Sequence, residues 1–297
     1  MKIDPRHLAQ LAAILEAGSF QAAADELGLT QPALSRNMRM LEARLDAPIF
    51  ERSGKRSLPT ALGRRLARSG LAIRAAEEQA GVQASLWAEG RRGELRLGAP
   101  PIVSGRFLTK AISRFLVAHP SWTLDLQVGL VPELQAMLAR GRIDLLIGPQ
   151  SLVDQEARLD FEPLIDDRIG VLCRADHPLT RIDRLTARHL ETQSWLVHSR
   201  GSLLRQQTEA ALLAAGLEKI RIGCEAGATG SALEIVAATD LLTAMPVAMT
   251  CPYLEGRLTF LSFDHPLFRR PIGIMRRRGS VLDSGAQWLV EHLRDTA

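Results

Sequence analysis

The chain has 297 residues, of which 46% are hydrophobic and 24% charged, and its formal net charge is +4. A chain of this length usually folds around more than one hydrophobic core, so we expect a globular protein of two or three domains. The sequence contains no run of about 18 apolar residues that would span a bilayer. Charged residues interrupt any apolar run before residue 10, which argues against a secretory signal. We therefore expect a cytoplasmic protein without a membrane partner.

The three cysteines, Cys173, Cys224 and Cys251, are widely spaced and have no Cys-x-x-Cys pair or histidine cluster beside them. This spacing argues against a disulfide framework and against structural zinc. A redox pair of Cys224 and Cys251 is disfavoured, because neither adjoins the dense basic cluster that would lower a thiol pKa. We expect each cysteine to be a small buried apolar residue, and we expect no metal site.

The positive charge is concentrated near the amino terminus. Residues 31–74 carry ten basic and three acidic side chains, a net charge of +7, which leaves the rest of the chain slightly acidic. A basic segment beside a near-neutral body is typical of a phosphate-binding domain joined to a different module. The alternative is a basic face that is simply solvated.

Two short helices precede this segment in the sequence. Apolar residues at helical spacing mark the first over about residues 8–15, and Gly18 and Ser19 open the second, residues 20–27. Gly28 follows and supplies the positive φ that a tight turn between two helices requires. The arrangement predicts the first half of a helix-turn-helix unit.

Residues 30–41 predict a third helix with two different faces. Leu34, Met38 and Leu41 repeat at the spacing of a buried stripe. Thr30 is a suitable N-cap, and a proline in the first turn does no damage. The other face carries side chains suited to base edges and phosphates: Gln31, Pro32, Ser35, Arg36 and Arg39. We expect Gln31 to pair with adenine and either arginine with guanine.

A short β-hairpin with a basic tip is predicted after this helix. Residues 49–52 and 56–58 flank Ser53, Gly54 and Lys55, which gives the geometry of a wing. We expect Arg52, Lys55 and Arg56 to contact phosphates or the minor groove. Helix-turn-helix spacing alone is a weak signal, but together with the two-faced helix and the basic wing it indicates binding of double-stranded DNA.

These segments resemble the LysR-type transcriptional regulators. The matching stretches include Ala17-Gly18-Ser19-Phe20, Gln31-Pro32-Ala33-Leu34-Ser35, Leu41-Glu42, Phe50-Glu51-Arg52 and Pro59-Thr60-Ala61-Leu62-Gly63. The usual glycine after the recognition helix is Asp46 here. The resemblance implies a homodimer that assembles into a homotetramer on promoter or operator DNA, with RNA polymerase as a further candidate partner.

A long helix is expected next, because residues 60–87 contain no proline. The helix would be about 40 Å long. A seven-residue repeat runs through Leu62, Leu66, Ser69, Ile73, Ala76, Ala80, Gln83 and Trp87. This seam favours pairing with the same helix of a second subunit, as the linker helix does in the family. The alternative is a helix that lies on its own domain. We assign residues 1–60 to the winged domain and 61–90 to the linker.

From residue 91 onward, strands alternate with helices in two successive runs of comparable size. Such alternation predicts an α/β fold with parallel strand pairing and two lobes. The resemblance implies an effector domain like a periplasmic solute-binding protein, with the chain crossing between lobes near residues 162–166 and 265–270. Lobe I would then comprise residues 91–163 and 268–297, and lobe II residues 164–267.

An effector site is expected in the loops that follow the strands. Ligands of open α/β sheets bind outside the carboxyl ends of strands, against helix N-termini. The candidates are Ile102, Ser104, Gly148, Pro149, His198, Arg200, Ser202, Gly227 and Thr229. Arg200 would serve as an anion clamp. Any one of them can equally be a cap or turn former, and His198 fits better as a structural hydrogen-bond partner.

Enzyme motifs are absent from the sequence: it has no Gly-x-Ser-x-Gly, no Gly-x-x-x-x-Gly-Lys and no His-Glu-x-x-His. We therefore predict no catalytic residues and no cofactor. The sequence indicates a DNA-binding transcription regulator controlled by a small-molecule effector, whose identity stays open. The alternative is a small-ligand sensor that acts through protein partners and carries a vestigial DNA-binding domain.

Overall fold

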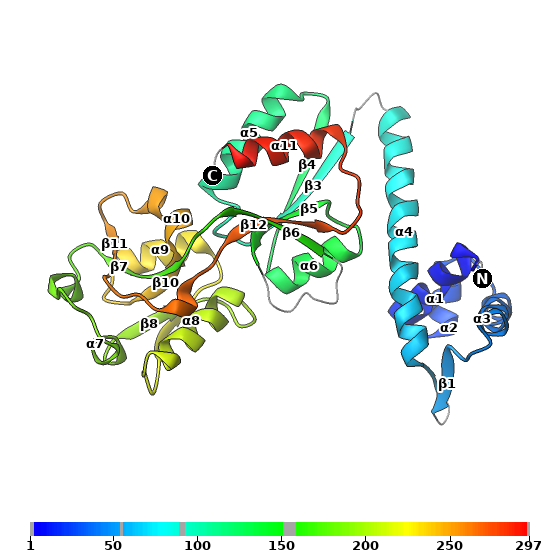
Figure 1. Ribbon diagram of the computed structural model, residues 1–297, viewed down its shortest axis with the longest axis horizontal. Helices are drawn as coiled ribbons and strands as arrows, with labels where there is room; N and C mark the ends of the chain where they lie inside the picture. Colours follow the sequence, from blue (N-terminus) through cyan, green and yellow to red (C-terminus); the bar gives the residue numbers. More distant parts are fainter. Residues whose placement is uncertain (1–2, 54–55, 89–92, 151–158, 296–297) are drawn as a thin grey trace. The chain divides into compact units, whose positions relative to one another are not determined.

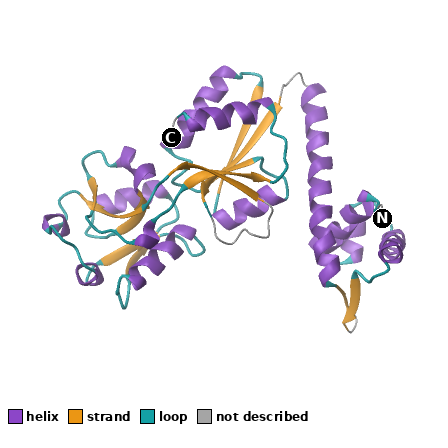
Figure 2. Cartoon of the chain, in the orientation of Figure 1, coloured by secondary structure: helices purple, strands orange, loops and turns teal. Residues whose placement is uncertain are grey.

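In the computed structural model, which describes residues 3–53, 56–88, 93–150 and 159–295, the chain folds into two compact units. The first contains the N-terminal helices and a hairpin, and the second contains two α/β lobes (Figures 1 and 2). This arrangement confirms the predicted fold class, a helical winged domain followed by a two-lobed α/β domain.

The N-terminal unit follows the predicted order of elements. Its elements are α1 (Pro5–Ala17), α2 (Phe20–Glu26), α3 (Gln31–Leu45), β1 (Phe50–Ser53), β2 (Arg56–Pro59) and α4 (Ala61–Ala88). Ser19 caps α2 by accepting from the Ala22 amide, and Thr30 caps α3 by accepting from the Ala33 amide. Gly28 has φ 64°, so the left-handed turn predicted between α2 and α3 is confirmed.

The apolar stripe of α3 packs into the core of this unit. Leu34, Met38 and Leu41 are all almost completely buried, together with Leu11 of α1 and Ile49 before the hairpin. Asp46, which ends α3, has φ 49°. That left-handed conformation suits glycine best and is tolerated by aspartate better than by most residues, so the departure from the family's usual glycine leaves the turn intact.

Two glycines bring α4 close to its own domain. A Cβ atom on Gly70 would lie 1.9 Å from the Leu8 carbonyl oxygen of α1, and one on Gly63 would lie 2.2 Å from the Ile49 carbonyl oxygen. Ala67, between them on the same face of α4, is buried. The first half of α4 therefore lies on the N-terminal core, while its second half extends beyond α1 (Figure 1).

Lobe I of the second unit is built on one five-stranded sheet. Its elements are β3 (Gly93–Ala99), α5 (Arg106–Ala118), β4 (Trp122–Val128), α6 (Val131–Ala139), β5 (Leu145–Pro149), β6 (Leu159–Ile165), β12 (Ile272–Arg277) and α11 (Ser284–Arg294). The strand order is β4-β3-β5-β12-β6. Helices α5 and α11 pack on one face of the sheet and α6 on the other (Figure 1).

Lobe II holds two smaller sheets. Its strands are β7 (Ile169–Arg174), β8 (Ser194–Val197), β9 (Arg221–Glu225), β10 (Thr243–Pro246) and β11 (Leu258–Phe260). Its helices are α7 (Ala187–Glu191), α8 (Leu203–Ala214), α9 (Thr229–Ala237), α10 (Val247–Thr250) and the 3-10 turns η2 (Pro178–Arg181), η3 (Cys251–Tyr253) and η4 (Pro266–Phe268). The sheets are β10-β7-β11 and β8-β9, joined by a bridge between Trp195 and Leu242.

The prediction of uniformly parallel pairing is wrong for several strands. β3 is parallel to β4 and β5, and β8 is parallel to β9. β12 is antiparallel to β5 and β6, and β7 is antiparallel to β10 and β11. The physical reason in lobe I is that β6 and β12 carry the chain out of the lobe and back, so they run in opposite directions.

The two connections between the lobes lie side by side. The chain leaves lobe I after β6 and returns into β12, and an antiparallel bridge joins Arg168 to Arg269 between these connections. They fall within a few residues of the predicted crossings. β6 itself, with Pro163 in its middle, was not predicted as a strand.

The structure corrects the expectation that every cysteine is buried. Cys173 is buried, but Cys224 is half-buried and Cys251 is exposed, because Cys251 begins a 3-10 turn on the surface. The last helix, α11, begins at Ser284, because Asp283 accepts from the Ala286 amide and caps the helix there. Within the ranges given above, no helix combines the length and apolar character that crossing a bilayer requires.

Candidate functional sites

The outward face of α3 presents the five residues that the sequence singled out. Pro32, Arg36 and Arg39 are exposed, whereas Gln31 and Ser35 are half-buried. The Gln31 Nε2 donates to the Ser35 Oγ at 3.0 Å, which orders the two polar side chains before any ligand arrives. A cationic, proline-bearing face thus lies opposite the buried stripe of the same helix.

Two polar contacts that sequence reasoning missed hold α3 in place. The Asn37 Nδ2 donates to the Gln10 Oε1 of α1 at 2.9 Å. The Glu42 Oε1 accepts from the backbone amides of Ile49 and Phe50 at 2.9 and 3.2 Å. The second contact couples the start of the hairpin to α3. The Leu41-Glu42 pair is one of the stretches that resemble the family, and this resemblance was the signal that could have pointed to Glu42.

The wing is a two-stranded antiparallel hairpin. Arg52 pairs with Ser57, and Ser53 pairs with Arg56, along β1 and β2. Two of the three predicted basic wing residues, Arg52 and Arg56, therefore lie at the end of the hairpin nearest its tip. Lys55 lies outside the described residues.

The predicted seam of α4 divides between two environments. Leu62 and Leu66 pack against the core of their own domain. Further along, Ile73 is half-buried and Ala76 and Ala80 are exposed, as is Ser69. The side chains of the last two seam residues, Gln83 and Trp87, lie outside the described part of the structure.

The second unit contains a small cavity of about 50 Å³ where loops from both lobes meet. Its lining comprises Pro100, Pro101, Ile102, Gly129, Leu130, Val131, His198, Ser199, Ser202, Leu203, Leu204, Gly227, Thr229, Met245 and Arg270. The first six come from lobe I and the rest from lobe II and the connection that returns from it. Most of the lining follows the carboxyl ends of β3, β4, β8 and β9, as the strand-end rule predicts.

Five of the nine predicted effector residues line this cavity: Ile102, His198, Ser202, Gly227 and Thr229. The other four do not. The Ser104 Oγ donates to the Pro101 carbonyl oxygen, and Gly148 and Pro149 are buried in β5, where they pair with β12. Arg200 is exposed, and its backbone and charge interact with Glu225.

His198 lies in the cavity wall and also has a structural partner. Its Nε2 lies 3.0 Å from the Ala244 carbonyl oxygen, so in this geometry Nε2 carries the proton. Burial lowers the pKa of His198, and the positive charges of Arg270 and Arg205 lower it further. The imidazole is therefore neutral at pH 7.

Arg270 is the cavity residue that sequence reasoning missed most clearly. It follows η4 on the connection back to lobe I, only 3% of the residue is exposed, and its Nη1 donates to the Gln207 Oε1 of α8. No strand-end rule points to a connection between lobes, so the sequence offered no signal for it. Leu130 and Val131, by contrast, follow β4 and could have been found by the rule already applied.

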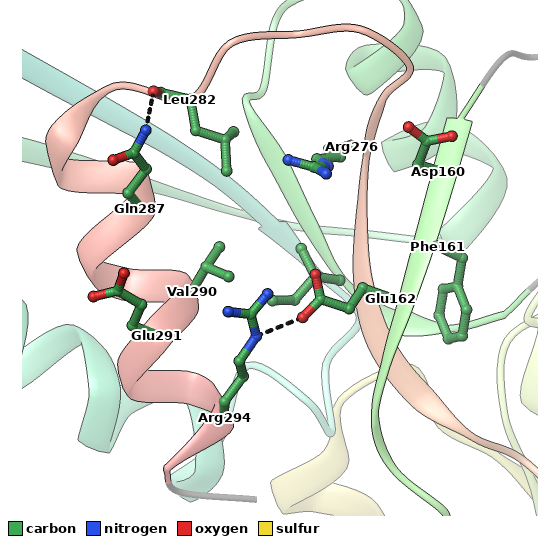
Figure 3. Close-up of a pocket in the computed structure, with 10 residues that line it drawn as sticks. Asp160, Phe161, Glu162, Arg276, Leu282, Gln287, Val290, Glu291 and Arg294 are labelled. Carbon is green, nitrogen blue, oxygen red and sulfur yellow. Dashed lines mark hydrogen bonds and ion pairs between the residues drawn. The ribbon is translucent and has the colours of Figure 1, made fainter.

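A larger cavity, of about 340 Å³, lies between α11 and the strands β6 and β12 (Figure 3). Its charged groups largely neutralise one another. The Arg294 Nε donates to the Glu162 Oε1 at 2.6 Å, and the Asp160 carboxylate accepts from the Arg278 Nε at 3.0 Å. The two carboxylates on β6 are already paired with arginines. This larger cavity therefore has fewer unpaired charged groups for a charged ligand than the smaller cavity has.

Metal binding finds no support in the described ranges, where no three histidine, cysteine, aspartate or glutamate side chains are grouped to hold an ion.

Comparisons with known proteins find matches for both parts of the chain. Residues 5–64 match the family model described as "Bacterial regulatory helix-turn-helix protein, lysR family", and residues 88–297 match the "LysR substrate binding domain". The SDS degradation transcriptional activation protein of Pseudomonas sp. is 30% identical over 96% of this chain and 93% of its own length. The transcriptional regulator GbpR of Azospirillum brasilense is 28% identical over 99% of this chain and 86% of its own length.

Full-length CbnR, solved in complex with its target DNA, shares the fold with a TM-score of 0.56 and 21% identity, over 99% of this chain and 100% of that one. None of these findings supports a sensor that has lost its DNA-binding function. The chain belongs to the LysR family and is a DNA-binding transcription regulator with an effector-binding domain, not an enzyme.

Proposed function

We propose that this regulator works in the cytoplasm and reads its operator with the outward face of α3. The observation that carries the proposal is the division of α3 into two faces. Leu34 and Leu41 are at most 1% exposed, whereas Arg36 and Arg39 on the other side are exposed. A helix that hides its leucines and presents arginines has the form that the major groove admits.

Individual roles follow from side-chain chemistry. The Gln31 amide suits the N6/N7 edge of adenine, and a guanidinium of Arg36 or Arg39 suits the O6/N7 edge of guanine. Pro32 offers an apolar surface to a thymine methyl group, and Ser35 donates to a base or a phosphate. Arg52, Lys55 and Arg56 of the wing reach phosphates or the adjacent minor groove.

The linker helix α4 joins two subunits in this proposal. DNA half-sites repeat with two-fold symmetry, so a symmetric dimer fits them. The support is the exposed part of the seam, with Ser69, Ala76 and Ala80 uncovered, in a helix of 28 residues whose first half already lies on its own domain. Dimers then assemble into tetramers, and RNA polymerase is a further partner of the DNA-bound assembly.

The effector binds in the cavity between the lobes. At about 50 Å³ the cavity is far below the roughly 300–1,000 Å³ of common ligand sites, so entry requires the lobes to separate at their two connections. One contact that holds them together is the Tyr253 hydroxyl of lobe II, which accepts from the Arg106 amide at the start of α5 in lobe I at 2.6 Å. An effector that binds more tightly to one arrangement of the two lobes increases the fraction of molecules in that arrangement.

Selection from a pool of random duplex DNA tests the DNA-binding proposal. We expect enrichment of a motif with two-fold symmetry and loss of that enrichment when both Arg36 and Arg39 are replaced by alanine. A protein that enriches no motif would contradict the proposal.

The effector site is tested by thermal unfolding with sugars, aromatic acids and amino acids. The Ser202 side chain makes no capping hydrogen bond to α8, so it is available to a ligand. Ser202→Leu is expected to abolish the response, whereas Ser231→Leu, at an exposed position of α9, should preserve it. A full response in Ser202→Leu would remove this loop from the site.

A further inference from the structure

The guanidinium of Arg270 is buried at the cavity without a full set of partners. Its Nη1 donates to Gln207, but its Nε makes no hydrogen bond and has almost no contact with solvent. Only 3% of the residue is exposed. An arginine carries five N–H donors, and a buried donor without an acceptor is costly.

The nearby carboxylate does not neutralise this cation fully. Asp167 attracts Arg270 electrostatically, but its oxygens accept from the backbone amides of Arg168 at 2.7 Å, Ala248 at 2.9 Å and Met249 at 3.4 Å. In the described part of the chain, no carboxylate lies within ion-pair distance of Arg270. Burial lowers the pKa of Arg270 to about 10, so the group is still protonated at pH 7.

Two helix N-termini add to the positive potential of the cavity. Ser202 and Leu203 at the start of α8, and Thr229 at the start of α9, line it. Neither helix has a side-chain cap hydrogen bond at its N-terminus. Uncapped amides there attract anions, and the Arg270 guanidinium, whose Nε has no acceptor, lines the same cavity.

We propose that the effector is a small carboxylic acid whose carboxylate is held by Arg270 and the first turns of α8 and α9. This inference rests on the effector cavity proposed above and names its ligand class. The charge balance favours a monoanion, because His198 is neutral and Arg270 is the one cation that lines the described cavity. Arg270, rather than the predicted Arg200, is thus the anion clamp.

Matched pairs of acid and amide test the charge requirement on the full-length protein. Thermal unfolding is followed with formate and formamide, acetate and acetamide, and benzoate and benzamide, at constant ionic strength. We expect a saturable rise in melting temperature with at least one acid, at a concentration at least tenfold below that needed for its amide.

Variants then assign the effect to Arg270. Arg270→Met is expected to abolish the preference for the acid. Arg269→Met is the matched control, because Arg269 is adjacent and exposed, pairs with Asp166, and should leave the preference unchanged. If Arg270→Met does not fold, Arg270→Lys keeps the charge and should weaken acid binding about tenfold or more without removing it.

Three results would overturn the inference: equal responses to acid and amide, an acid preference that survives in Arg270→Met, or no response of the wild-type protein to any acid. Failure here is distinguishable from failure of the proposed function. The selection of DNA motifs requires no effector, so it tests the proposed function separately. A response to a neutral ligand that depends on Ser202 would support the cavity as the effector site and would contradict a carboxylate as the effector.

Discussion

The Glu42 Oε1 of α3 accepts a hydrogen bond from the backbone amide of Ile49, the residue before the hairpin, at 2.9 Å. The same carboxylate oxygen accepts from the Phe50 amide at 3.2 Å, where β1 begins. One side chain of α3 therefore binds the backbone at the base of the hairpin and holds the hairpin to the helix.

Glu42→Ala is expected to lower the free energy of unfolding by about 1–3 kcal/mol, because two partly buried amides lose their acceptor. Urea unfolding of the full-length protein measures this change. Glu42→Gln keeps one acceptor oxygen and should lose less. An alanine variant that is as stable as the wild type would show that water replaces the carboxylate at no cost.

Arg36→Ala should weaken binding to the selected operator by about 1–3 kcal/mol and relax preference at one base pair, if this residue reads guanine. Competition binding against operators changed at single positions measures both effects. Arg36→Lys keeps the charge but loses the two-pronged hydrogen bond, so it should retain non-specific affinity. A uniform loss across all sequences would assign Arg36 to a phosphate instead.

Gly70→Ala is expected to destabilise the N-terminal unit by about 1–3 kcal/mol. The new Cβ would overlap the Leu8 carbonyl oxygen, a backbone atom that cannot rotate away as a flexible side chain could. Gly81→Ala in the same helix is the matched control. No heavy atom lies within 4 Å of a Cβ there, so this change should stabilise α4 by about 0.5–1 kcal/mol. Equal effects in chemical unfolding would refute the close approach of α4 to α1.

Protonation of His198 should make the protein less stable in mild acid. Its pKa is lowered in the folded protein by burial and by Arg270 and Arg205, whereas in the unfolded chain it stays near 6.5. As the pH falls below about 6.5, the unfolded state takes up a proton that the folded state resists, so the free energy of unfolding decreases.

Urea unfolding between pH 7.5 and pH 5 measures this slope, and His198→Asn should flatten it. The slope should be shallower when a carboxylate occupies the cavity, because an anion beside Arg270 stabilises a protonated imidazole. An unchanged slope in His198→Asn would assign the pH dependence to other groups.

Helix α3 was predictable because its signals are local. The spacing of Leu34, Met38 and Leu41, the cap at Thr30 and the turn at Gly28 all act within a few residues. The lining of the cavity between the lobes was predictable in part, since Ile102, Ser202 and Gly227 follow strands and the strand-end rule needs only their order in the chain.

The remainder depends on pairings that are distant in sequence. β12 pairs with β5 in the sheet of lobe I although it lies more than 100 residues later in the sequence. No local sequence pattern therefore reveals that the two strands are antiparallel. Arg270 reaches the cavity from the connection between lobes, and the missing acceptor for its Nε is a property of the packed structure alone. Cys251 was misjudged for a similar reason, because a short surface turn exposes a residue type that is usually buried.

The most direct test of the central claim is the binding of the full-length protein to the DNA that flanks its own gene, measured by gel shift at low salt with competitor DNA. We predict a retarded complex that survives non-specific competitor and is lost when Arg36 and Arg39 are both replaced by alanine. The absence of any complex at low salt, or a complex unaffected by the double replacement, would contradict the assignment of α3 as the reading helix.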